Sequence, residues 1–158
     1  MNIITDNFVL MTAITGWFAA QSLKIIIDVI LNKKFNPERL MGAGGMPSSH
    51  SATVTALTTA IALKEGVSSS LFALSFMFAF IVMYDATGVR RETGKQSMLL
   101  NKILSENIFE LHGEEFDKKL REYIGHTPLQ VVCGAILGLI IAIILWKIYN
   151  VYFFNKFL

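Results

Sequence analysis

Three long apolar blocks constrain the fold of this chain more than any other feature. A helix needs roughly 20 residues to cross the hydrocarbon core of a bilayer. The blocks run from Phe8 to Leu31, from Val67 to Tyr84 and from Leu129 to Tyr149. Of the 158 residues, 53% are hydrophobic and only 16% are charged, which is more apolar than a soluble domain requires. We therefore predict an integral membrane protein.

A fourth block, from Ser51 to Leu63, is shorter and rich in threonine. Alanine recurs every four positions, at Ala52, Ala56 and Ala60, and this spacing lets helices approach closely inside a membrane. We expect this block to lie inside the bundle instead of facing lipid. The expected fold class is an all-α membrane bundle of about four hydrophobic helices, forming a single domain over residues 1–158.

Two polar connectors separate the apolar blocks, from Asn32 to Ser49 and from Asp85 to Thr127. The second is expected to form one or two interfacial helices. If the blocks cross the membrane in order, both connectors lie on one side. That side carries ten basic residues: Lys33, Lys34, Arg39, Arg90, Arg91, Lys95, Lys102, Lys118, Lys119 and Arg121. The other side carries only Lys64, Lys147 and Lys156. The positive-inside rule therefore predicts that the connectors are cytoplasmic.

Other features of the composition argue against several classes of protein. The net charge of +2 is small and the basic residues are not interleaved with aromatic ones, so we expect no nucleic-acid partner. The single Cys133 lies in an apolar run, where a buried, unreactive thiol is the expected state. No lysine or arginine precedes Phe8, so the first block is expected to be a retained helix and not a signal peptide.

The segment from Gly42 to Ser51, Gly-Ala-Gly-Gly-Met-Pro-Ser-Ser-His-Ser, precedes the threonine-rich block. Glycines let the backbone approach a ligand closely, and Ser48 or Ser49 can cap a helix that starts there. The amides and the dipole at such a helix start attract phosphate, and His50 would meet the anion. The alternative is a glycine turn followed by an ordinary serine cap.

A second histidine stands at the start of the last apolar block, in Gly125-His126-Thr127-Pro128-Leu129-Gln130. Thr127, Pro128 and Gln130 have the spacing of a capping box with proline at the first helical position. His126 lies just outside this cap, so the cap does not explain it. An interfacial anchor is the alternative role for this histidine. Gln130 follows it by four residues and is also a candidate hydrogen-bond partner of its ring.

Charged residues mark the end of the Val67 block, where Asp85 is followed by Arg90 and Arg91. Arginine forks bind phosphate oxygens in a bidentate manner, although an ion pair at the lipid headgroups is the alternative. Lys24 lies within the first apolar block, where a charge is costly and suggests function; snorkelling to the interface is the competing interpretation. The two histidines, the two arginines and the glycine-serine segment are expected at one membrane boundary, where histidines and arginines together suit phosphoryl transfer.

From about Lys24 to Gly138 the chain resembles the type 2 phosphatidic acid phosphatase and vanadium-haloperoxidase superfamily, in its small divergent membrane branch. Pro47-Ser48-Ser49-His50-Ser51 is similar to the superfamily's Pro-Ser-Gly-His motif. His126 matches the histidine of the His-x-x-x-Asp motif, and Gln130 stands where the aspartate would be. The segment from Tyr84 to Arg91 resembles a motif of the divergent branch, whereas the superfamily's Lys and Arg-Pro motif is represented by Lys24 alone.

The resemblance implies a metal-independent phosphatase without a cofactor. It implies that His126 attacks phosphorus and that His50 protonates the leaving oxygen. The motif's arginine is missing shortly before His126, so either Arg121 or the favoured Arg90 and Arg91 would serve. Lys24, Ser48, Ser49, Arg90 and Arg91 are expected to bind the substrate. Because Gln130 cannot neutralise an imidazolium, we expect another carboxylate near His126 and favour Asp85 over Glu122. The expected partners are a lipid or polyprenyl phosphate and membrane lipids, and a homodimer is left open. A transporter of phosphorylated lipids and a non-catalytic membrane scaffold are the alternative functions.

Overall fold

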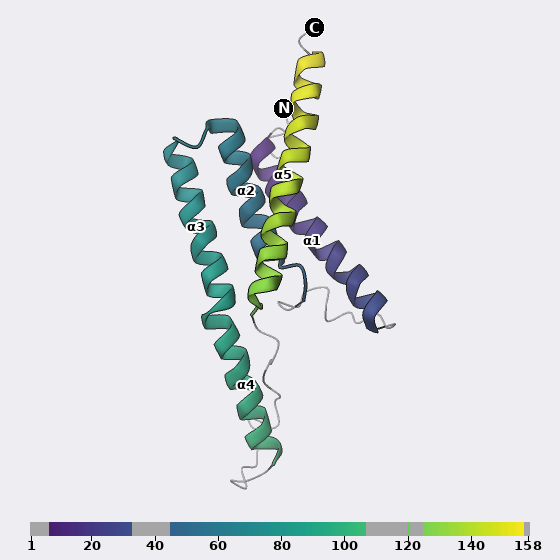
Figure 1. Ribbon diagram of the computed structural model, residues 1–158, viewed down its shortest axis with the longest axis vertical. Helices are drawn as coiled ribbons and strands as arrows, with labels where there is room; N and C mark the ends of the chain where they lie inside the picture. Colours follow the sequence, from purple (N-terminus) through teal and green to yellow (C-terminus); the bar gives the residue numbers. More distant parts are fainter. Residues whose placement is uncertain (1–6, 33–44, 107–119, 121–124, 157–158) are drawn as a thin grey trace.

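The computed structural model describes residues 7–32, 45–106, 120 and 125–156. Within these residues the structure consists of helices and their connections. The helices are α1 (Phe8–Asn32), α2 (Ser49–Glu65), α3 (Ser70–Thr87), α4 (Val89–Ser105) and α5 (Pro128–Lys156). Figure 1 shows α1 and α3 running in one direction and α2 and α5 in the other. The predicted all-α membrane bundle is therefore confirmed.

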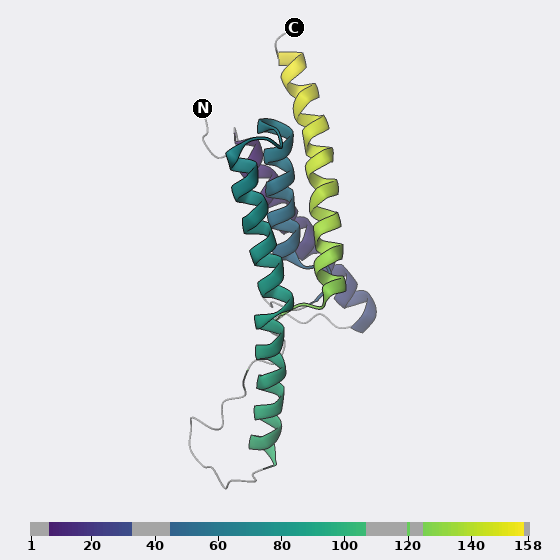
Figure 2. The same ribbon diagram turned by 60° about the vertical axis from the view of Figure 1, so that its left-hand side comes forward.

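Three stretches of the described helices are long and apolar enough to cross a membrane: Phe8–Ile30, Ser70–Ser105 and Pro128–Val151. They correspond to the three long blocks of the sequence. The second is longer than predicted because α4 follows α3 with only Gly88 between them. Figure 2 shows α4 as a continuation of α3 that extends beyond the other helices. The helical part of the second connector is thus α4, and residues 107–119 and 121–124 lie outside the described residues.

Helix α2 is the central helix of the bundle, and it packs against α1, α3 and α5. Its alanines Ala52, Ala56 and Ala60 are all fully buried, as the spacing predicted. Gly16 of α1 and Gly138 of α5 lie directly against this stripe, where an added Cβ would overlap α2. Small residues on all three helices therefore allow the close approach that stabilises packing in a membrane.

One threonine of α2 satisfies its hydroxyl group through a neighbouring helix. Thr58 donates to the carbonyl oxygen of Ser75 on α3, at 3.1 Å. At one end of the bundle, Phe8 of α1 contacts the rings of Trp146 and Tyr149 on α5, with centroids 5.3 and 4.9 Å apart. At the opposite end, α2 and α5 begin and α3 passes into α4 (Figure 1). We call this opposite end the site end.

Candidate active site

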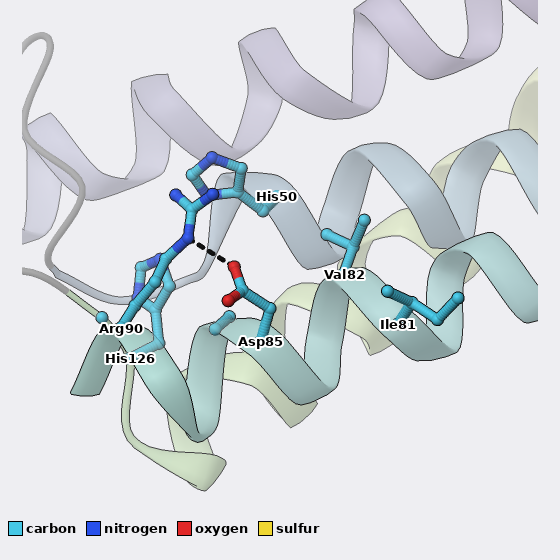
Figure 3. Close-up of a pocket in the computed structure, with 8 residues that line it drawn as sticks. His50, Ile81, Val82, Asp85, Arg90 and His126 are labelled. Carbon is cyan, nitrogen blue, oxygen red and sulfur yellow. Dashed lines mark hydrogen bonds and ion pairs between the residues drawn. The ribbon is translucent and has the colours of Figure 1, made fainter. Parts of the chain in front are cut away.

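A pocket of about 240 Å³ lies at the site end, and four polar side chains line it. They are His50, Asp85, Arg90 and His126, all of which the sequence had singled out. They come from three places in the chain: the first turn of α2, the junction of α3 with α4, and the residues just before α5. Ile81 and Val82 of α3 form part of the wall, as Figure 3 shows.

The backbone of His126 is bound to α3, which fixes the position of this residue. Its N–H donates to the carbonyl oxygen of Ala86 on α3, at 2.9 Å. Gly125 before it has a φ of +104° and lies against the backbone of Arg90 and Arg91. A side chain at position 125 would be strained and would overlap that backbone. Gly125 and His126 are thus fixed to the junction of α3 and α4, and His126 is only 3% exposed.

The predicted capping box at the start of α5 is present and also fixes the His126 ring. The Thr127 N–H donates to Gln130 Oε1 at 2.9 Å, and the Gln130 N–H donates to Thr127 Oγ1 at 3.4 Å. Gln130 Oε1 also lies 3.3 Å from His126 Nδ1. The Thr127 backbone N–H can only donate, so the Gln130 atom that it contacts is the side-chain oxygen. Because that oxygen can only accept, Nδ1 of His126 must carry the ring hydrogen.

With Nδ1 protonated, the neutral ring of His126 presents a lone pair at Nε2. This nitrogen is buried and has no hydrogen-bond partner among the described residues. Leaving a buried polar atom unsatisfied costs about 1–3 kcal/mol, so such an atom in a pocket is a candidate for chemistry. Burial also lowers the pKa of His126, although the Gln130 hydrogen bond raises it in part. The effect of burial is the larger of the two, so the imidazole of His126 is neutral at neutral pH.

His50 stands in the first turn of α2, and its ring faces that of His126. The ring centroids are 6.0 Å apart and the planes meet at 62°. The two helix starts are tied together, because the Ser48 N–H donates to the carbonyl oxygen of Gln130 at 3.0 Å. Gly134 of α5 allows this approach, since a Cβ there would overlap Ser48. Unlike His126, His50 is exposed.

Arg90 and Asp85 form an ion pair through Arg90 Nε. Figure 3 shows the guanidinium of Arg90 beside the His50 ring, with Asp85 below it. Asp85 was expected to support His126, but the structure places its carboxylate on Arg90, and the group on His126 Nδ1 is Gln130. The physical reason is that α4 continues α3 closely enough for Arg90, five residues after Asp85, to reach back to it.

The other expected substrate-binding residues do not line this pocket. Ser48 is fully buried; its amide binds Gln130, and its hydroxyl caps α2 by accepting from the Ser51 amide at 3.4 Å. The expectation that the Ser48 amide faces phosphate is therefore wrong. Ser49 is 6% exposed. The side chain of Arg91 is not part of the lining, whereas its backbone supports Gly125.

Lys24 of α1 is 2% exposed, so it does not extend to the interface by snorkelling. Its charge is one of the smaller causes that lower the pKa of His126, after burial. Within the described part of the chain, no cluster of three or more histidine, cysteine, aspartate or glutamate side chains could hold a metal ion. Among the described residues, the positive charges that act on both histidines are those of Lys24 and Arg90.

The fold and this site define an integral membrane protein with a paired-histidine pocket at one end of its helix bundle. The chain belongs to the divergent PAP2 family, whose model matches residues 5–141. It is similar to the uncharacterized membrane protein YuiD of Bacillus subtilis (strain 168), with 41% identity over 154 residues that cover 92% of this chain and 97% of the relative. No solved structure matches the chain.

Two features of the site were not evident from the sequence. The first is Ala86, which contributes only its carbonyl oxygen to hold His126; a backbone contact of this kind leaves no signal in residue type. The second is the apolar wall of Ile81 and Val82, which looks like ordinary lipid-facing helix in the sequence. The spacing of Asp85 from these two residues, three and four positions, could have indicated that all three share one face of α3.

Proposed function

We propose that this protein is a metal-independent membrane phosphatase, which hydrolyses a phosphate monoester or diphosphate of an amphiphilic substrate through a phosphohistidine. Membership of the divergent PAP2 family supports phosphate chemistry. The observation that carries the proposal is the unpaired Nε2 of His126, in a pocket that it shares with His50 and Arg90.

In the first step, the Nε2 lone pair of His126 attacks phosphorus, a P–N bond forms, and the bond from phosphorus to the leaving oxygen breaks. Protonated His50 donates its proton to that oxygen, so the leaving group departs as an alcohol or a monophosphate. The negative charge of a bound phosphate favours the protonated form of His50. Gln130 keeps the Nδ1 proton of His126 in place while the ring becomes positively charged.

In the second step, water attacks the phosphohistidine and neutral His50 accepts its proton. The P–N bond breaks, inorganic phosphate is released, and His126 returns to its neutral state. The charges of Arg90 and Lys24 stabilise the oxygens on which negative charge accumulates. Asp85 holds Arg90 by its Nε, which leaves the two terminal nitrogens of the guanidinium for phosphate.

Phosphate release from purified protein tests this proposal. The substrates are phosphatidic acid, a polyprenyl diphosphate and dodecyl phosphate in mixed micelles, and the matched variant is His126→Ala. We expect release by the wild type and a loss of at least about 1000-fold in the variant, typical of removing a catalytic nucleophile. Binding of these substrates without any phosphate release would favour a lipid-phosphate transporter instead.

The basic residues at the site end support a cytoplasmic orientation for the pocket. Single cysteines at Ser105 on α4 and at Ser68 in the α2–α3 turn, in a Cys133→Ala background, test it in intact cells. An impermeant thiol reagent should label the cysteine at position 68 and spare that at position 105. Labelling of position 105 alone would place the pocket outside the cell.

A further inference from the structure

Helix α4 extends beyond the other helices of the bundle (Figure 2), and only Arg90 at its start lines the pocket. Among the described elements, α4 contacts α3 alone. Gly94 and Ser97 are nevertheless buried, and Asn101 follows them on the same face of the helix. This face lies outside the pocket, and the reaction steps described above give it no role.

The side chain of Asn101 binds both backbone groups of a single residue, Leu120. Asn101 Nδ2 donates to the Leu120 carbonyl oxygen at 2.8 Å, and the Leu120 N–H donates to Asn101 Oδ1 at 2.9 Å. A primary amide supplies the donor and the acceptor that such a double contact requires. The backbone N–H can only donate, so the orientation of the Asn101 amide is fixed as well.

Leu120 belongs to the part of the chain that leads to His126. Ser105, the last residue of α4, stands 20 positions before Gly125, and Leu120 stands five positions before it. Gly125 lies against the backbone at the start of α4. The chain therefore leaves α4 at the end of the helix and contacts it again at two described points, first at Asn101 and then beside the pocket.

The contact between Asn101 and Leu120 shortens the loop that must close before His126 can occupy the pocket. The entropic cost of closing a loop of n residues grows as 3/2 RT ln n. A loop of five residues instead of 20 is therefore favoured by a factor of about 8. One backbone hydrogen bond, to Ala86, joins His126 to α3. A factor of this size then changes how often His126 leaves its position.

We propose that Asn101 is a positioning residue for His126, because it fixes the returning chain on α4 and so keeps the imidazole in the pocket. Its part in turnover rests on the proposed function, whereas its effect on the position of His126 does not. At a rise of 1.5 Å per residue, Asn101 lies about 16 Å from Arg90 along the helix axis. It therefore acts through the chain and touches no substrate.

Hydrogen exchange resolved to single amides by mass spectrometry tests this role. Asn101→Ala removes the double contact. Gln96→Ala is the matched control, because the Gln96 side chain is an exposed amide on the same helix that has no hydrogen bond within the described residues. In Asn101→Ala we expect faster exchange at Leu120 and an exchange of the His126 amide that is faster by roughly 8-fold. Gln96→Ala should leave both rates as in the wild type.

Chemical modification of the two histidines is the second measurement. Diethyl pyrocarbonate acylates unprotonated imidazole nitrogens. His126 Nε2 is buried, whereas His50 is exposed, so only His126 must leave its position before it reacts. Asn101→Ala should raise the modification rate of His126 by roughly 8-fold and leave that of His50 unchanged.

The effect on turnover should fall on kcat and not on KM. With dodecyl phosphate, Asn101→Ala should lower kcat by roughly 10-fold at an unchanged KM, because Arg90 and His50 keep their places. The pH dependence of kcat/KM should not move, since Gln130 still binds the His126 ring.

Unchanged exchange and modification of His126 in Asn101→Ala would overturn the proposal. An equal rise in the exchange of Ala56, in the middle of α2, would also overturn it, because Asn101 would then stabilise the whole bundle and not the position of His126. If the wild type releases no phosphate, the phosphatase proposal fails, and exchange and modification still decide the role of Asn101.

Discussion

The starts of α2 and α5 each carry a histidine to the same pocket, but they hold it in opposite ways. His126 precedes its cap and is buried, with its backbone bound to Ala86 and its ring to Gln130. His50 follows its cap and is exposed. A nucleophile benefits from a fixed position and one tautomer, whereas a group that exchanges protons with a leaving group and with water needs access to both. The difference teaches which histidine is suited to which step.

The largest expected difference between the two histidine variants is in how their turnover depends on the leaving group of the substrate. With dodecyl phosphate, both His126→Ala and His50→Ala should lose about 1000-fold in turnover, since an alkoxide needs a proton to leave. With p-nitrophenyl phosphate, whose leaving group needs no proton, the first-turnover burst of nitrophenol should survive in His50→Ala and vanish in His126→Ala. A burst that survives in His126→Ala instead would reverse the two roles.

The ion pair between Asp85 and Arg90 is the next largest contribution that we expect. Asp85→Asn should reduce turnover on the order of 100-fold, because the guanidinium loses the charge that orients it beside the histidines. Arg90→Lys should lose a similar amount, since an ammonium group cannot contact both Asp85 and phosphate with a planar fork. The control is Glu92→Gln, which breaks the exposed pair with Lys95 on the same helix. Equal turnover in Asp85→Asn and wild type, in folded protein, would remove Asp85 from the site.

Gln130 should have a smaller, double effect, because it serves both the cap of α5 and the ring of His126. Gln130→Ala should lower stability by about 1 kcal/mol through the lost cap and turnover by roughly 10-fold through the lost tautomer control. Thr127→Ala removes the other half of the cap without touching the ring, so it should lower stability alone. If both variants lower turnover equally, the contact of Gln130 with the ring has no catalytic role.

The smallest expected effect is a shift in pH dependence. Burial lowers the pKa of His126 below its ordinary value of 6.5, and attack needs the neutral ring. The acid limb of kcat/KM that His126 sets should therefore lie below pH 6.5. The Gln130 hydrogen bond raises this pKa, so Gln130→Ala should move the limb to lower pH still. A limb above pH 6.5, or one that moves upward in Gln130→Ala, would contradict this account of the His126 environment.

The sequence predicted most of the fold because membrane crossing depends on length and hydropathy, which a single sequence states directly. It also located both histidines, Asp85 and Arg90, since each stands at the end of an apolar block and its type suits phosphate chemistry. It did not predict which groups pair. Arg90 reaches Asp85 because only Gly88 separates α3 from α4. The Ser48 amide binds the carbonyl oxygen of Gln130 because Gly134 lets the starts of α2 and α5 approach closely. Such pairings depend on packing between distant segments.

Direct detection of the intermediate tests the central claim, that His126 is the group which attacks phosphorus. His50→Ala with p-nitrophenyl phosphate should accumulate it, because the first step no longer needs a proton donor while the second has lost its base. After an alkaline quench, which preserves a P–N bond, mass spectrometry should find a phosphoryl group on His126 of the His50→Ala variant. The double variant that carries both His50→Ala and His126→Ala should have none. Nitrophenol release with no phosphoryl group on His126, or with the group on another residue, would contradict the account.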